Sequence, residues 1–314
     1  MELEIPGSIV DAHAHLFTRR CFEVLARQMG DRLPKGQELE TMQEITGVEI
    51  PDEDPAALAT RWTLQMDRHG IAQMVVIASV PGDQASVLEA HRLHPERLIP
   101  YAMFNPREPG AVPALKEAAS LGLAGVCLFP AMHQFSVDDD PALELIAAAA
   151  RSALVVFVHF GLLRVAIRDK LGLHSPFDLR YGNPIALCKA AQLHPRTPFV
   201  IPHLGCGFFR EVLLLSRQCP NMLLDTSSSN SWVGTQPGRP SLEDVFAQAL
   251  DVVGPTRLLY GSDSTTFPRG YRIDILEQQI AIFRDLGIAP SEEVQVFGGN
   301  QIRILGRSAG PNHS

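Results

Sequence analysis

The chain alternates short apolar runs with longer amphipathic segments along most of its length, and this alternation restricts the fold more than any other feature. Each apolar run is nearly continuous, which is typical of strands that are buried on both faces of a parallel sheet. Eight runs are predicted to be strands: Ile9–Ala12, Met74–Ser79, Leu98–Phe104, Gly125–Phe129, Leu154–Val158, Phe199–Pro202, Met222–Asp225 and Leu258–Tyr260.

Amphipathic segments lie between these runs and predict helices that cover a sheet. They are Pro55–His69, Ala85–His94, Pro113–Leu121, Pro141–Arg151, Pro184–His194, Phe208–Cys219, Leu242–Val253 and Arg272–Leu286. Strands that are each followed by a helix favour a closed barrel over an open sheet, and no glycine-rich nucleotide-binding turn follows the first strand. We therefore predict an α/β protein with one domain, a (β/α)8 TIM barrel over residues 1–307, and a disordered tail at 308–314.

Three connections are too long to be simple loops, namely residues 16–54, 160–183 and 226–241. All three leave the carboxyl ends of predicted strands, which is the face where barrel enzymes place their active sites. The third is rich in Ser, Asn and Gly, and we expect it to form a mobile lid or rim.

Ionisable residues stand where four of the predicted strands end. The first strand leads into His13 and His15, which point the same way because side chains alternate along a strand. Taken alone, such a pair fits simple packing as well as metal binding. The fifth, sixth and eighth strands also end abruptly, in His159, His203 and Asp263. Burying such groups is costly unless they are paired or bind a metal, so the set predicts a metal site at the barrel mouth.

Two further segments carry a family resemblance. Tyr260–Pro268 reads Tyr-Gly-Ser-Asp-Ser-Thr-Thr-Phe-Pro, and Gly299–Leu305 reads Gly-Asn-Gln-Ile-Arg-Ile-Leu. With the strand-end residues, they resemble the amidohydrolase superfamily and its amidohydrolase-2 branch, which is related to aminocarboxymuconate semialdehyde decarboxylase. The resemblance implies that His13, His15, His159 and Asp263 bind the metal. It also implies that His203 is a catalytic residue beside that metal.

The fourth predicted strand bears on the number of metal ions. Binuclear relatives bridge two metals with a carboxylated lysine at its end, whereas here Gly125–Pro130 contains no lysine. We therefore expect one divalent metal ion. Three imidazoles and a carboxylate favour Zn²⁺, with Mn²⁺ or Fe²⁺ as alternatives. Cys127 in this strand is expected to be a small core residue.

The ligand set and the resemblance together predict a metal-dependent hydrolase that acts on a small molecule. Metal-activated water would attack a C–N or C–O acyl bond, with Asp263 as base and His203 stabilising the developing charge. The alternative is a metal-dependent non-oxidative decarboxylase of an aromatic or unsaturated carboxylic acid, in which an acid protonates the carbon that loses CO2. Both reactions occur in this branch and use the same strand-end residues. A metal-independent lactonase and a barrel that only binds a ligand are minor alternatives.

Loops on the catalytic face supply candidates for substrate binding. We name His133, Arg164 and Arg269, because an arginine in such a loop can bind a carboxylate through two hydrogen bonds. Asp11 shares the orientation of His13 and His15. It either orients these histidines, bonds a neighbouring strand or caps a turn, and the sequence leaves the three roles open.

Charge and cysteine content limit the partners and the compartment. The net charge of −8 argues against nucleic-acid binding, and no apolar run approaches the roughly 20 residues that span a membrane. Five widely spaced cysteines favour reduced thiols, and Met1–Val10 does not resemble a signal peptide. We expect a cytoplasmic enzyme with a small-molecule substrate and neither a membrane nor a nucleic-acid partner. Relatives in the branch often form dimers, which makes a homodimer a candidate assembly.

Overall fold

Eight parallel strands form one sheet in chain order in the computed structural model, which describes residues 7–227 and 230–308. The chain closes this sheet, because Ala14 pairs with Ser264 after the last strand and the Ala12 N–H donates to the Tyr260 carbonyl over 2.9 Å. The predicted (β/α)8 TIM barrel is confirmed. The strands are β1 (Ile9–Leu16), β2 (Ile71–Ala78), β3 (Leu98–Met103), β4 (Gly125–Leu128), β5 (Val155–Val158), β6 (Phe199–Ile201), β7 (Met222–Asp225) and β8 (Leu258–Leu259).

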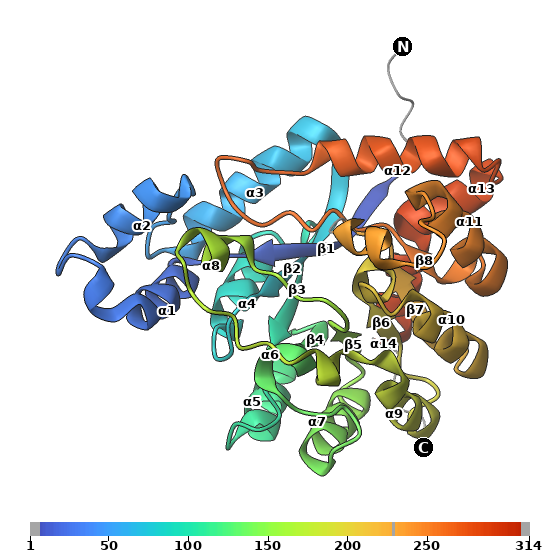
Figure 1. Cartoon of the computed structure of the whole chain (residues 1–314), viewed down its shortest axis with the longest axis horizontal. Helices are drawn as coiled ribbons and strands as arrows, with labels where there is room; N and C mark the ends of the chain where they lie inside the picture. The colour runs from blue at the N-terminus through green and yellow to red at the C-terminus, as the bar shows by residue number, and fades with distance from the viewer. Residues whose placement is uncertain (1–6, 228–229, 309–314) are drawn as a thin grey trace.

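Helices form the outer layer around the strands (Figure 1). The predicted helix over 184–194 is divided, because Asn183 caps a 3-10 turn at Pro184–Leu187 before a regular helix begins. The helices are α1 (Arg19–Met29), α2 (Glu38–Thr46), α3 (Pro55–His69), α4 (Gln84–Leu93), α5 (Ala111–Ser120), α6 (Pro130–His133), α7 (Asp140–Arg151), α8 (Ala166–Lys170), α9 (Cys188–Leu193), α10 (Phe209–Gln218), α11 (Leu242–Val253), α12 (Ile273–Asp285), α13 (Pro290–Val294) and α14 (Asn300–Ser308).

The first strand is longer than predicted, and this places the histidines. β1 continues to Leu16 instead of ending at Ala12, since His15 pairs with Ile77 of β2. His13 and His15 are therefore held by a backbone ladder and not by a loop. Such support fixes the direction of a side chain more tightly than a surface loop does.

Side chains fill the barrel interior at the end opposite the mouth. A substrate can therefore be bound only at the mouth, where the carboxyl ends of the strands lie. Tyr101 of β3 lies against Gly125, where an added Cβ would come within 2.7 Å of the ring. The phenol accepts a hydrogen bond from Gln301 of α14 over 3.2 Å, and Ile304 of the same helix packs into the inner core. Cys127 is buried in this core, as predicted.

The long connections build the rim of the mouth. Helices α1 and α2 follow β1, and α8 follows β5. Side chains of these three helices form an apolar cluster that is separate from the barrel core. Figure 1 shows the three helices on one side of the barrel. Lys170 fastens α8 to α2 by donating to the Thr46 carbonyl over 2.6 Å. In the third connection, Trp232 is fully buried beside Phe209. The tail predicted at 308–314 falls, after Ser308, outside the described residues.

Across residues 7–227 and 230–308, none of the helices combines the length and apolar character that crossing a membrane requires.

Candidate metal centre

Five side chains from four strand ends converge at the mouth of the barrel. His13 and His15 come from β1, His159 follows β5, His203 follows β6 and Asp263 follows β8. The ring of His13 lies 5.0 Å from that of His15, 5.1 Å from that of His159 and 5.0 Å from that of His203, centre to centre. Two overlapping groups have ligand atoms within 4.8 Å of one another, one of His13, His159 and His203 and one of His13, His15 and Asp263.

The Nε2 atoms of the two β1 histidines face each other at a distance that fits a cation bound between them. Their Nε2 atoms are 3.1 Å apart. His13 Nδ1 lies 2.7 Å from a carboxylate oxygen of Asp225, which makes this nitrogen the protonated one. Ser79 Oγ donates to the Ile77 carbonyl, so it accepts from His15 Nδ1 over 2.9 Å. When both rings are neutral, both Nε2 atoms therefore carry lone pairs, which repel each other unless a cation lies between them.

The remaining imidazoles fit the same ion. Within the described part of the chain, His159 Nε2 is buried and has no hydrogen-bond partner. Burial, followed by repulsion from the neighbouring histidines, holds the pKa of His159 well below its usual range. Burial and repulsion from His13 likewise lower the pKa of His15 to about 3. Both rings are thus neutral near pH 7, which is the state that binds a metal.

Asp263 completes the set as its carboxylate. One of its oxygens lies 3.7 Å from His13 Nε2 and 3.6 Å from His15 Nε2. The side chain is 18% exposed, so it is the member of the group most open to the mouth. Neutral imidazoles with one carboxylate suit a divalent metal, and ligation by these residues stays a prediction.

Backbone strain is concentrated at this site. His203, Leu204 and Cys206 have positive φ angles of 53°, 51° and 42°, and Asp263 has one of 55°. Residues other than glycine adopt this region at an energetic cost and do so mainly where function requires it. Two of the three residues that the sequence singled out besides the β1 pair, His203 and Asp263, therefore adopt this costly conformation.

Asp225 and Ser227 belong to the site and were not predicted. Asp225 ends β7 and, like His13, is fully buried. Ser227 Oγ lies 3.0 Å from His13 Nδ1 and 2.9 Å from His203 Nδ1, so one hydroxyl bridges two histidines. The signal for Asp225 was present, because the apolar run Met222–Asp225 also ends in an ionisable residue.

Asp11 takes one of the three roles that the sequence left open. Its Oδ1 accepts from the N–H of His13 over 2.9 Å and from the N–H of Ser262 over 3.0 Å, so it ties β1 to the chain after β8. It does not contact the rings of the histidines through any of these bonds. Burial raises the pKa of Asp11 to about 6.

The three predicted substrate-binding residues lie in different surroundings. Arg164 is 72% exposed and pairs with Asp169 over 2.7 Å. Arg269 donates to Thr265 Oγ1 over 2.7 Å and lies close enough to Asp263 for mutual attraction. His133 is half-buried in α6 and is a member of neither metal-binding group. A role in substrate binding stays a prediction for all three, and Arg269 is the best placed.

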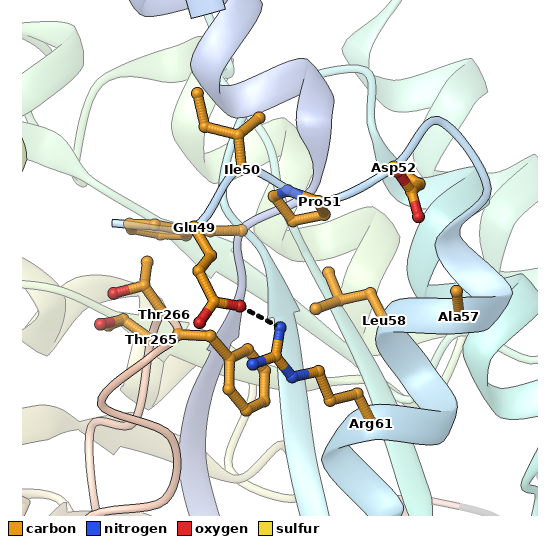
Figure 2. A pocket seen from close by; sticks show the side chains of 11 residues that line it. Glu49, Ile50, Pro51, Asp52, Ala57, Leu58, Arg61, Thr265 and Thr266 are labelled. Atoms are coloured by element: carbon orange, nitrogen blue, oxygen red, sulfur yellow. Dashed lines mark hydrogen bonds and ion pairs between the residues drawn. The ribbon is translucent and has the colours of Figure 1, made fainter. Parts of the chain in front are cut away.

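Aromatic rings line the space beside the metal ligands. Phe129 stacks on His159 with ring centres 4.4 Å apart, and Phe17 lies 5.7 Å from His15. Phe17 also lines a pocket of about 140 Å³ (Figure 2), whose lining residues do not include the predicted metal ligands. In that pocket Arg61 pairs with Glu49 over 2.5 Å, and its guanidinium lies 3.8 Å from the centre of the Phe267 ring.

Comparison with known proteins places these features in a family. No curated protein sequence matches the chain. Among solved structures, 5-carboxyvanillate decarboxylase from Sphingomonas paucimobilis is 16% identical, with a TM-score of 0.63 over 95% of this chain and 98% of that one. A mutant of 5-carboxyvanillate decarboxylase from Novosphingobium aromaticivorans, with bound manganese, is 13% identical, with a TM-score of 0.66 over 97% and 100%.

A hydrolase has the same fold. A probable 2-pyrone-4,6-dicarboxylic acid hydrolase from Acinetobacter baumannii is 15% identical, with a TM-score of 0.60 over 95% of this chain and 99% of that one. At such identities these likenesses establish the barrel and not the reaction. The family model described as amidohydrolase, which represents the amidohydrolase-2 branch, matches residues 10–307. The chain therefore belongs to the amidohydrolase family.

Proposed function

We propose that this protein is a metal-dependent, non-oxidative decarboxylase of an aromatic or unsaturated carboxylic acid. Hydrolysis of an acyl bond was the first prediction from the sequence and decarboxylation its alternative. The solved decarboxylases with the same fold support the alternative, since their names give hydroxylated aromatic acids as substrates. The observation in this chain that carries the proposal is the aromatic lining of the metal-binding side chains.

That lining suits a flat substrate with a negative charge. Phe17 and Phe129 flank His15 and His159, and aromatic rings pack well against other aromatic rings. Arg269 lies close enough to Asp263 for mutual attraction, and its guanidinium can pair with a carboxylate group of the substrate. The pocket lined by Phe17 also contains two threonines and Arg61, which pairs with Glu49, and it would take a polar substituent of the substrate. An unsubstituted aliphatic amide would have neither a ring to pack against the aromatic side chains nor a charge to pair with Arg269.

His13, His15, His159 and Asp263 would hold the metal. When bound, a divalent metal would bind oxygen atoms of the substrate and withdraw electron density from the ring. Mn²⁺ and Zn²⁺ both accept this donor set.

The reacting atoms then need a proton and a stabilised charge. The bond to the carboxylate carbon breaks with its electron pair left on the ring carbon, CO2 departs, and a proton forms the new C–H bond. Asp263 reaches from the ligand group toward the mouth and is the candidate carrier of that proton. His203 would donate a hydrogen bond to a substrate oxygen and hold the substrate in place. The buried aromatic walls would keep bulk water from the reacting carbon.

A direct assay separates the two reactions. The metal-loaded protein is incubated with hydroxylated benzoates and, separately, with lactones and amides, while CO2 and the products are measured. We expect CO2 in equal amount to an aromatic product that lacks one carboxyl group, and loss of this activity in His203→Asn. The control His94→Ala changes the half-buried histidine that follows α4 at its carboxyl end and is expected to keep full activity. Turnover of a lactone or an amide without any CO2 would instead establish the hydrolase.

A further inference from the structure

The hydroxyl of Ser227 lies between two histidines with different roles. Its oxygen is 3.0 Å from Nδ1 of His13, a predicted metal ligand, and 2.9 Å from Nδ1 of His203, the predicted catalytic residue. All three side chains are buried, with Ser227 fully enclosed. A neutral imidazole carries its proton on one nitrogen only, and the partner of the other nitrogen decides which one.

The position of each hydrogen follows from the partners. Asp225 Oδ2 lies 2.7 Å from His13 Nδ1, and a carboxylate accepts, so His13 Nδ1 carries a proton. Ser227 Oγ therefore faces an N–H on its His13 side and can only accept there. Its own hydrogen has His203 Nδ1 as its acceptor, and this requires a lone pair on His203 Nδ1.

We propose that Ser227 is a positioning residue that fixes His203 as the tautomer with its proton on Nε2. His203 then presents a hydrogen-bond donor toward the substrate instead of a lone pair toward the metal. This assignment separates the two groups of potential ligands. His203 leaves the group that it forms with His13 and His159, and His159 stays as a ligand beside His13, His15 and Asp263. This inference rests on the proposed function in one respect only, namely that the hydrogen-bond acceptor of His203 Nε2 is an oxygen atom of the substrate.

The surrounding backbone holds the hydroxyl in place. The N–H of Ser227 donates to Asp225 Oδ1, which folds the chain after β7 into a tight turn. Gly261 lets this turn and β1 lie close together, because a Cβ there would lie 2.7 Å from Asp225 Oδ1, 2.9 Å from His13 Cβ and 3.0 Å from Ser227 Cβ. The positive φ of His203 brings its ring to the same hydroxyl from the other side. Three separate segments are thus shaped around one oxygen atom.

The tautomer can be observed directly by NMR of protein with ¹⁵N-labelled histidine, recorded without metal and after loading with zinc, which is diamagnetic. The signals of His203 are assigned by their absence in His203→Asn. We expect a protonated Nε2 and an unprotonated Nδ1 in the wild type. In Ser227→Ala we expect the Nδ1–H tautomer to become populated. A wild-type His203 that is protonated at Nδ1, or a tautomer unchanged in Ser227→Ala, would overturn the proposal.

Thr226→Ala serves as the matched control. Thr226 is equally buried and adjacent, but its hydroxyl bonds Leu259 and Gln279 on the outer side of β7. We expect an unchanged His203 spectrum and activity in this control, and about a 10- to 100-fold lower kcat in Ser227→Ala. Metal content should equal that of the wild type in both variants, since Asp225 still orients His13. Loss of metal from Ser227→Ala would show that the serine serves the metal site instead. Because the spectra need no substrate, they stand whether the reaction is decarboxylation or hydrolysis.

Discussion

The histidine in α6 offers a test of burial energetics that is independent of the metal. Burial lowers the pKa of His133 from 6.5 to about 4, and its Nδ1 is buried with no hydrogen-bond partner among the described residues. In the unfolded chain this imidazole takes up a proton as the pH falls through its ordinary pKa. In the folded protein it stays neutral until the pH approaches about 4. The unfolded state therefore binds more protons in that window, and the stability contributed by neutral His133 is lost as the pH falls.

The size of the effect follows from the two pKa values. Each unit of difference corresponds to about 1.4 kcal/mol. Integration over the window gives a loss of about 2 kcal/mol in the free energy of unfolding at pH 5, and about 3 kcal/mol at pH 4. Glutamine has no proton to gain, so His133→Gln removes this contribution and leaves the rest of the pH dependence in place.

Urea unfolding of the wild type and His133→Gln near pH 7.5 and near pH 5 measures the difference. We expect the variant to gain about 2 kcal/mol relative to the wild type as the pH is lowered. His94→Gln, at the carboxyl end of α4, is the control and should follow the wild type. Parallel curves for His133→Gln and the wild type would refute the reasoning, because they would mean that His133 takes up its proton equally well in the folded protein.

Three further predictions concern the site. Asp225→Asn removes the charge beside His13 Nδ1 and should weaken metal binding by about 10- to 100-fold, measured by competition with a chelator; unchanged affinity would contradict this role. Gly261→Ala places a Cβ 2.7 Å from Asp225 Oδ1, so it should lower the free energy of unfolding in urea by about 1–3 kcal/mol and reduce the metal content. A variant with the stability and metal content of the wild type would show that no steric clash occurs there. Arg61→Met should raise KM about 10-fold with little change in kcat, since a lost charge contact of about 1.4 kcal/mol has this effect on binding; an unchanged KM would exclude the pocket from substrate binding.

Much of the barrel could be predicted because its strands are buried on both faces. Nearly continuous apolar runs identified the eight strands, and ionisable residues at the ends of four of them identified the five converging side chains. Boundaries were less well predicted. β1 extends to Leu16 because His13 and His15 continue the ladder, which hydropathy cannot reveal, and β2 begins at Ile71, ahead of the predicted Met74.

The contacts around the site were harder to predict for a physical reason. Asp225 carries the same signal as His159, an ionisable end to an apolar run, and could have been included. Ser227 could not, because its bridging position depends on a tight turn and on the left-handed backbone of His203. The aromatic wall likewise depends on where Phe17 and Phe129 point once β1 and β4 are assembled.

We predict that these strand ends hold one divalent metal ion. Elemental analysis of the purified protein, alongside His13→Ala and Asp263→Ala, tests it most directly. We expect about one ion of zinc, manganese or iron per chain in the wild type and its loss in both variants. Less than about a tenth of an equivalent in the wild type, unchanged after metal is added back, would contradict it.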